Sequence, residues 1–211
     1  KEILHTKEAK EEPKPLGLEK MNEGFLDASQ VQYVSRAGNF RREGYHYTGA
    51  LRILKVLLSY DYLWLNVRVK GGAYGCMSGF TRSGDGYFTS YRDPHLSRTN
   101  EVYEGIPAYL EQFTAEEKEM TKYIIGTFSS VDAPLTPAAK TSRSATAYLT
   151  GVTDEMLKRE RAEILNATGE DIRGLAGIVR AVLKENALCV IGNEEKINQE
   201  KDLFREIKNL Y

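Results

Sequence analysis

Two side chains six residues apart, Arg68 and Tyr74, are the best candidates in this sequence for binding a polar substrate. Arg68 offers a planar fork of N–H donors to carbonyl or carboxylate oxygens, and Tyr74 offers one phenolic donor. Between them, Gly71 and Gly72 have no Cβ and so allow another backbone to come close. Two donors directed at one place suit an oxyanion or the backbone of a bound peptide. The plainer interpretation is a surface arginine in an ion pair beside an aromatic residue on a strand face.

Hydrophobic periodicity places Arg68 near the end of a helical segment. Apolar side chains recur on one helical face between residues 47 and 60, which predicts a helix packed on a sheet. Residues 61–68 are expected to continue it as a second short helix. Upstream, residues 30–35 alternate in character before Gly38, which predicts a first strand.

Tyr74 is expected at the start of a β-hairpin. Residues 73–80 and 87–92 alternate, and the Ser-Gly-Asp-Gly run between them supplies turn residues. In the second strand Tyr87 and Tyr91 would share one face, and Phe88 would lie on the other. One face is expected to line a chamber and the other to pack against helices, but the sequence does not say which.

Helices dominate the remainder of the predicted structure. The order of elements predicts an α+β fold of two layers, in which a largely antiparallel sheet packs one face against helices. The predicted elements are a helical segment near 96–113, a capping box at 114–117 that opens another helix, helices after Pro137 and Thr153, an amphipathic helix through 172–183, a strand at 187–191 and a last helix near 201–208.

Composition fits one domain and argues against several kinds of partner. With 211 residues, 41% of them hydrophobic, the chain can build one sizeable core. Its 29 basic and 30 acidic residues nearly cancel, so no nucleic acid is expected to bind. No apolar run approaches the roughly 20 residues that cross a bilayer, so no membrane association is expected. Cys76 and Cys189 are too few for a disulfide scaffold, and we expect both to be buried.

The first segment of the chain differs from the rest. Residues 1–21 are rich in lysine and glutamate, contain Pro13 and Pro15, and show no apolar periodicity, which predicts a linker or mobile arm. Residues 22–211 are expected to form the domain. We expect a cytoplasmic location, with an organelle matrix as the alternative for a eukaryotic source.

The run Arg-Val-Lys-Gly-Gly-Ala-Tyr-Gly at residues 68–75 is one of several segments that bring a family to mind. The others are Gly-Tyr-Phe at 86–88, Ser-Tyr-Arg-Asp-Pro at 90–94, Gln-Val-Gln-Tyr-Val at 30–34 and Leu-Thr-Gly-Val-Thr-Asp-Glu at 149–155. Together they resemble the C-terminal domain of the presequence protease and falcilysin branch of the insulinase-like zinc metallopeptidases, which are inverzincins. The resemblance covers about residues 22–211, so the chain looks like the last quarter of a longer enzyme.

This resemblance implies a role for the arginine and tyrosine. In the family, the pair reaches from the C-terminal domain to the zinc site, binds the substrate backbone and helps to stabilise the tetrahedral oxyanion. Arg68 and Tyr74 are therefore expected to be catalytic and substrate-binding, and Gly71 and Gly72 to let the substrate strand approach. The implied partners are the N-terminal zinc-bearing half of the same polypeptide and a short unfolded peptide.

The zinc site itself is expected to lie elsewhere. The family binds zinc through an inverted His-x-x-Glu-His helix in its N-terminal half. This chain contains only His5, His46 and His95, and no two of them have that spacing. The resemblance therefore implies that zinc belongs to the parent enzyme, that this fragment holds none, and that the fragment alone is inactive. Glu43 and His46 could share a metal on a helix, but no third ligand is evident nearby.

Two other classes of function stay open. A non-catalytic subunit could keep the fold and hold peptides or a partner without cleaving them, although the intact Arg68 and Tyr74 favour an enzyme. A stand-alone module unrelated to peptidases is supported only by the missing metal motif. A phosphate-binding loop at Gly71 and Gly72 is disfavoured because no Gly-Lys-Ser/Thr follows and the loop leads into a strand.

Overall fold

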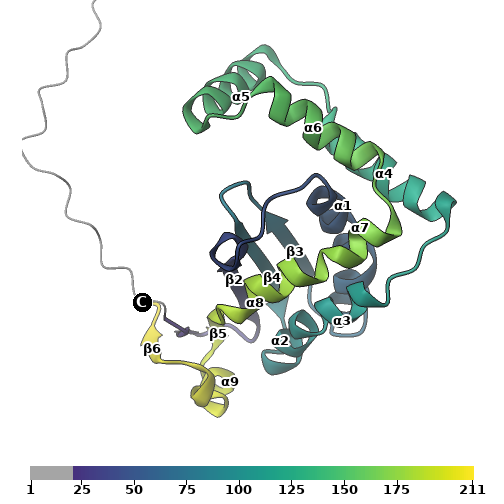
Figure 1. Ribbon diagram of the computed structural model, residues 1–211. Coiled ribbons are helices and arrows are strands. Elements are labelled where there is room, and N and C mark those ends of the chain that lie inside the picture. The colour runs from purple at the N-terminus through teal and green to yellow at the C-terminus, as the bar shows by residue number, and fades with distance from the viewer. Residues whose placement is uncertain (1–20) are drawn as a thin grey trace, which may run out of the picture.

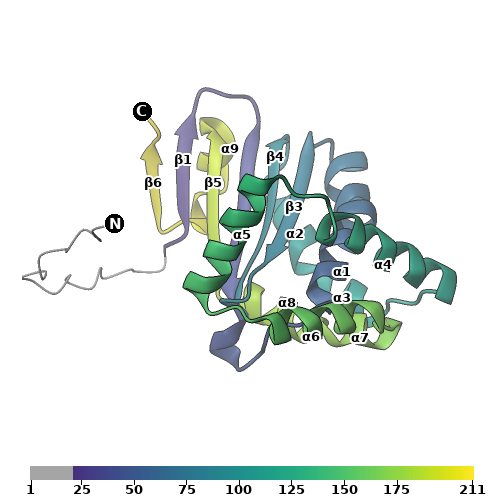
Figure 2. The same ribbon diagram turned by 90° about the horizontal axis from the view of Figure 1, so that it is seen from above.

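A computed structural model describes residues 21–211 and shows a six-stranded sheet with helices packed against it (Figure 1). The strand order is β3-β4-β2-β5-β1-β6. The pairings from β3 across to β5 are antiparallel, whereas β1 pairs in parallel with both β5 and β6. Figure 2 shows β6, β1 and β5 side by side at one end of the sheet and β4 and β3 at the other. The strands are β1 Glu23–Asp27, β2 Gln32–Asn39, β3 Gly75–Phe80, β4 Asp85–Asp93, β5 Ala187–Asn193 and β6 Glu206–Asn209.

The helices fall into two groups in the chain, before and after the β3–β4 hairpin. Those before it are the short η1 Phe40–Glu43 and a long helix made of α1 Ala50–Leu57, η2 Leu58–Tyr62 and η3 Trp64–Val69. Those after it are α2 Ser97–Glu104, α3 Ile106–Glu111, α4 Glu117–Val131, α5 Pro137–Thr150, α6 Asp154–Leu165, α7 Gly169–Gly174, α8 Ala176–Lys184, α9 Glu194–Gln199 and the short η4 Lys201–Leu203.

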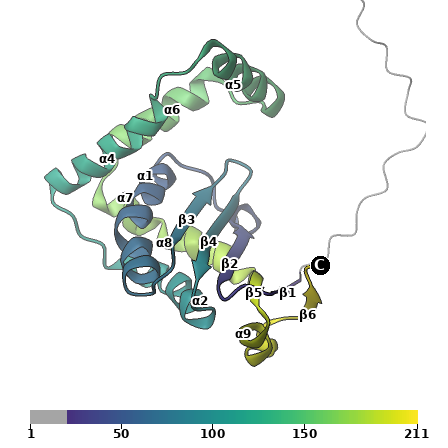
Figure 3. The same ribbon diagram turned by 180° about the vertical axis from the view of Figure 1, so that it is seen from behind.

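Helices cover only one face of the sheet. In β4, Phe88 is fully buried on the helix-covered face, whereas Tyr87 on the other face is 40% exposed. On the covered side, Val182 of α8 packs against Gly38 and Gly86 so closely that neither glycine has space for a Cβ. Figure 3, the view from behind, shows β3, β4 and β2 in front of α8. We call the uncovered side, which carries Tyr87 and Tyr91, the open face.

The helix that leads to Arg68 is α-helical only in its first part. After α1 it continues through η2 and η3 with the wider hydrogen bonding of a π-helix, in which residues five apart are joined. The N–H of Lys70, for example, donates to the carbonyl of Leu65 at 2.9 Å. Leu58 and Leu63, five residues apart, are both fully buried, as the wider turn allows. The predicted second helix at 61–68 is thus a continuation of the first.

The helices α4, α5 and α6 extend beyond the hairpin turn between β3 and β4 (Figures 1 and 3). α4 packs on α1, and α6 contacts both of them. α5 buries no residue of its own, and Tyr148 and Leu149 on it are 86% and 81% exposed. None of the helices between residues 21 and 211 is long and apolar enough to cross a bilayer.

The α+β fold, the one covered face, the hairpin and most of the helices are as predicted. The predicted helix at 201–208 is wrong, because this segment forms η4 and then β6, whose Ile207 pairs with Gly24 of β1. The predicted capping box at 114–117 is also displaced: Glu116 caps α4 and pairs with Glu119. The segments 96–113 and 172–183 each contain two helices.

Two smaller expectations concern the cysteines and the first segment. Cys76 and Cys189 are free thiols, and both are half-buried, less enclosed than expected. The predicted linker or arm at residues 1–21 lies outside the described residues, apart from Met21.

Candidate functional site

Arg68 lies in the last turn of η3, where its side chain is exposed. Its guanidinium carbon stacks over the ring of Trp64, 4.1 Å from the centroid, one turn earlier in the same helix. Stacking on a ring face leaves the N–H groups around the guanidinium edge able to donate. The helix and Trp64 therefore hold Arg68 in place without occupying its donors.

Tyr74 lies directly before β3, beside Arg68. Its N–H donates to the carbonyl of Arg92 at 3.2 Å, which fixes it to the end of β4. The ring meets that of Tyr91 edge-on with centroids 5.6 Å apart, and the Arg68 guanidinium carbon lies 5.9 Å from the Tyr74 ring centroid. The side chain is 59% exposed. The structure thus brings the two predicted residues together at the rim of the open face.

The two glycines between them are explained by the end of the helix. Gly72 has φ of +81°, a left-handed conformation that favours glycine, and its N–H donates to the carbonyl of Arg68 at 2.8 Å. Ala73 donates to the carbonyl of Val67 at 3.2 Å. A Cβ on Gly71 would collide with that same Val67 carbonyl. Both glycines are therefore needed to turn the chain from η3 into β3, and their expected role in substrate approach stays a prediction.

Residues at and just before the start of α2 form hydrogen bonds with the turn that follows η3 and with the end of β4. Arg98 donates to the carbonyl of Lys70 at 3.2 Å. Asp93 is fully buried and accepts from the Thr99 hydroxyl at 2.7 Å and from the His95 N–H at 2.9 Å. Its carboxylate is thus turned inward, toward the start of α2, and ties the end of β4 to that helix.

The structure adds Arg92, to which the sequence assigned no role, to this group. Its guanidinium carbon lies 5.6 Å from the Tyr74 ring centroid, and the side chain is exposed. Its φ is +48°, in the left-handed region that residues other than glycine rarely adopt. The ladder between β2 and β4 is irregular at this point, where the register shifts between Gln32 and Val34. A sequence signal existed for Trp64, four residues before Arg68 on a helix, but none predicted the turn of the backbone at Arg92.

Arg68 and Arg92 share a further property: within residues 21–211 neither makes an ion pair with a carboxylate. The thiol of Cys76 lies close enough to Arg68 and Asp93 for their charges to affect its pKa. Burial is the main cause that raises the pKa of Cys76 to about 11; Asp93 contributes to the rise and Arg68 opposes it. The thiol is therefore protonated at neutral pH and is no nucleophile there.

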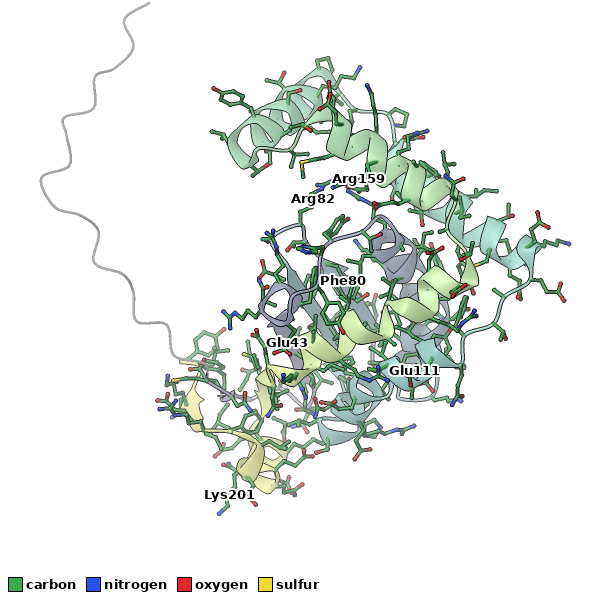
Figure 4. The ribbon with its side chains drawn as sticks, viewed as in Figure 1. Glu43, Phe80, Arg82, Glu111, Arg159 and Lys201 are labelled. Carbon is green, nitrogen blue, oxygen red and sulfur yellow. The ribbon has the colours of Figure 1, made fainter. Side chains whose placement is uncertain are left out.

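A cavity lined by several charged side chains lies at the opposite end of the hairpin. Its volume is about 500 Å³, and it lies between η1, the β3–β4 turn and α6. Arg82 and Arg159 point toward this gap in Figure 4. Glu160 on its wall is paired with Arg52 and Arg82. His46 also lines the cavity, while Glu43 pairs instead with Lys184 at 2.7 Å, so the two do not act as a pair of ligands.

Between residues 21 and 211, no three His, Cys, Asp or Glu side chains come together in a group that could hold a metal ion. What the Arg68 and Tyr74 pair can do is donate hydrogen bonds to oxygen atoms at the rim of the open face.

The sequence profile of the PreP C-terminal domain matches residues 22–194. The chain belongs to this family. Protein HypA of Clostridium perfringens is 49% identical over 193 residues, which cover 92% of this chain and 20% of that protein. Presequence protease 1, chloroplastic/mitochondrial, of Arabidopsis thaliana is 36% identical over 191 residues, which cover 89% of this chain and 18% of that protein. The PreP C-terminal domain described here thus spans about a fifth of the length of these relatives.

Solved structures show the same fold at low identity. A protease from Helicobacter pylori aligns with a TM-score of 0.61 and 15% identity, covering 81% of this chain and 43% of that one. The peptidase M16 inactive domain from Pseudomonas fluorescens aligns with a TM-score of 0.58 and 15% identity, covering 82% and 43%. The resemblance to presequence proteases is therefore confirmed, and this PreP C-terminal domain has the fold of M16 peptidase domains.

Proposed function

We propose that this PreP C-terminal domain is the part of a zinc metallopeptidase that supplies Arg68 and Tyr74 to a peptide-cleaving site. The observation that carries the proposal is their placement: the guanidinium and the phenol ring are adjacent and exposed at the rim of the open face. Neither side chain donates a hydrogen bond or makes an ion pair within residues 21–211. Both donors are thus free for the carbonyl of a substrate peptide and for the oxyanion formed from it.

The remaining parts of the site lie outside this chain. The metal, held by the N-terminal half of the parent polypeptide, would supply the activated water that attacks the peptide bond. The open face would form part of the wall of a chamber for short unfolded peptides, and its exposed Tyr33, Met77 and Tyr87 offer apolar contacts to them. The chain alone is then inactive. Because the names of relatives include mitochondrial and chloroplastic forms, an organelle matrix and the cytoplasm both suit this proposal.

The test mixes this chain with the separately expressed zinc-bearing half and follows cleavage of a quenched fluorescent peptide. Cleavage is expected only on mixing, and Arg68→Ala and Tyr74→Phe should each reduce kcat/KM by about 100-fold or more, since each removes one donor to the oxyanion. Arg42→Ala and Tyr60→Phe are matched controls on exposed residues outside the pair, and both should leave the rate unchanged.

A non-catalytic peptide-binding domain is the second candidate, favoured by solved neighbours described as inactive peptidase domains. It predicts a complex that binds peptide but keeps its cleavage rate in both site variants. That result would remove Arg68 and Tyr74 from the mechanism while leaving the family assignment intact.

A further inference from the structure

Two guanidinium groups lie within 6 Å of the ring centroid of Tyr74. Those of Arg68 and Arg92 lie 5.9 Å and 5.6 Å from the same ring centroid, and they come from different elements, the end of η3 and the end of β4. Each can stack on the ring and still present N–H groups to solvent. The two arginines therefore add N–H donors beside the Tyr74 ring.

The charge of this pair is not balanced by the protein. Elsewhere in the described chain, Arg52 and Arg82 share the carboxylate of Glu160. Neither Arg68 nor Arg92 has a carboxylate partner between residues 21 and 211. The adjacent Asp93 is fully buried and directed at Thr99 and His95. Both guanidinium groups lie within 6 Å of the same Tyr74 ring centroid, so a bound anion there would offset the positive charge of both.

The backbone conformation of Arg92 directs its side chain toward the ring of Tyr74. The residue has φ of +48° at an irregular point of the β2–β4 ladder. A bulge of this kind redirects a side chain, and the left-handed conformation is unfavourable for a residue other than glycine. The N–H of Tyr74 also donates to the carbonyl of Arg92. This hydrogen bond and the left-handed backbone together place the Arg92 side chain beside the Tyr74 ring.

We infer that Arg92, with Arg68, binds a carboxylate of the substrate peptide next to Tyr74 and so favours peptides that carry one at this position. The inference rests on the proposed function only in that the ligand is a peptide. A guanidinium matches a carboxylate with two parallel hydrogen bonds, and two guanidinium groups match it better than one. The carboxylate comes either from the C-terminus of the peptide or from an Asp or Glu side chain.

Trp64 provides a direct measurement of binding. It is the only tryptophan in the sequence, and the Arg68 guanidinium stacks on it. The intact chain is titrated to millimolar concentrations with four tryptophan-free peptides of otherwise equal sequence, and the fluorescence of Trp64 is followed. The first has a free C-terminus and no acidic residue, the second a C-terminal amide and no acidic residue, the third an amide and an internal Glu, and the fourth an amide and Gln at that place.

The expected result is a Kd about tenfold or more lower for the peptides that carry a carboxylate, since hydrogen bonds between charged groups are stronger than those between neutral ones. The first peptide responds if the C-terminus is bound, and the third if the side chain is. Arg92→Gln and Arg92→Gly should both abolish this preference. The glycine variant tolerates the left-handed backbone, so its loss of preference cannot be assigned to misfolding. Arg92→Lys should restore only part of it, and Arg42→Gln should leave it unchanged.

Equal affinity for all four peptides, or a preference that survives in Arg92→Gly, would overturn the inference. Its failure is distinct from failure of the proposed function. Cleavage that depends on Arg68 and Tyr74 without carboxylate preference would remove only the inference. Carboxylate preference at Trp64 without any cleavage on mixing would remove only the proposed catalytic role.

Discussion

The role of an arginine in this domain depends on the oxygen atoms that accept hydrogen bonds from it. Arg36 is almost fully buried and is matched by Glu104 at 2.8 Å, Asn100 at 2.7 Å and the carbonyl of Leu183 at 2.9 Å. Arg68 has an aromatic ring and no carboxylate beside it within the described residues. The first kind of arginine stabilises the fold, and the second keeps its donors for a ligand.

Glu160 offers a test of the stabilising kind. Its side chain is 9% exposed and is paired with both Arg52 and Arg82, whose side chains are 38% and 31% exposed. Glu160→Gln should lower the free energy of unfolding by about 1–3 kcal/mol, less than for a fully buried pair because water screens the arginines. Chemical denaturation followed by circular dichroism measures the change. Glu111→Gln, which breaks the half-exposed pair with Arg180, is the control and should cost under about 1 kcal/mol. Equal losses in the two variants would contradict the expectation.

At the scale of elements, the position of the site depends on how η3 ends. The chain leaves the helix through Gly72 in a left-handed conformation, and the two hydrogen bonds to Val67 and Arg68 close the turn. That turn sets Tyr74 beside Arg68 and starts β3. A change at Gly72 should therefore affect both stability and the environment of Arg68.

Gly72→Ala should lower the free energy of unfolding by about 1–2 kcal/mol, because a Cβ is disfavoured at φ of +81° although space for it exists, with only Pro94 nearby at 3.5 Å. The Trp64 fluorescence spectrum should shift as Arg68 moves. Gly174→Ala in α7 is the matched control: its φ is not positive and no atom lies within 4 Å, so a neutral or slightly stabilising effect is expected. A Gly72→Ala protein as stable as Gly174→Ala would show that the turn is not strained by a Cβ.

Elements defined by local pattern were predictable from the sequence, and those defined by distant pairing were not. The hairpin follows from alternation around a glycine-rich turn, so Tyr74 could be placed. β1 and β6 are short, and β1 pairs with residues far along the chain, Glu23 with Cys189 and with Glu206, so no local signal marks them. For the same reason Arg68 and Tyr74 were found in sequence, whereas Arg92 required the structure to show the turn of β4 toward Tyr74.

At the scale of the whole molecule, one sheet is packed on one side and left open on the other, while several acids with high pKa values lie in the packed part. Burial raises the pKa of Tyr109 to about 12 and that of Tyr103 further still. On the open face, partial burial likewise raises the pKa of Cys189. In the unfolded chain these groups ionise at lower pH than in the folded one. The folded state should therefore tolerate neutral pH well and lose stability in alkali.

Cys76 shows in which direction stability changes with pH, because folding raises the pKa of its thiol from 9.0 to about 11. Below pH 9 the thiol is protonated in both states, so its contribution to stability is fully present. Between pH 9 and pH 11 the unfolded chain ionises while the folded protein does not, so the free energy of unfolding falls as pH rises. The Cys76 part of that fall should be about 1–2 kcal/mol, reduced because the thiol is only half-buried.

Unfolding titrations at pH 8 and pH 10.5 measure this fall. The free energy of unfolding should differ less between the two pH values for Cys76→Ala than for the unmodified chain. Cys189→Ala should change the difference less, and a slope that is identical in all three proteins would show that the buried thiol does not couple folding to pH.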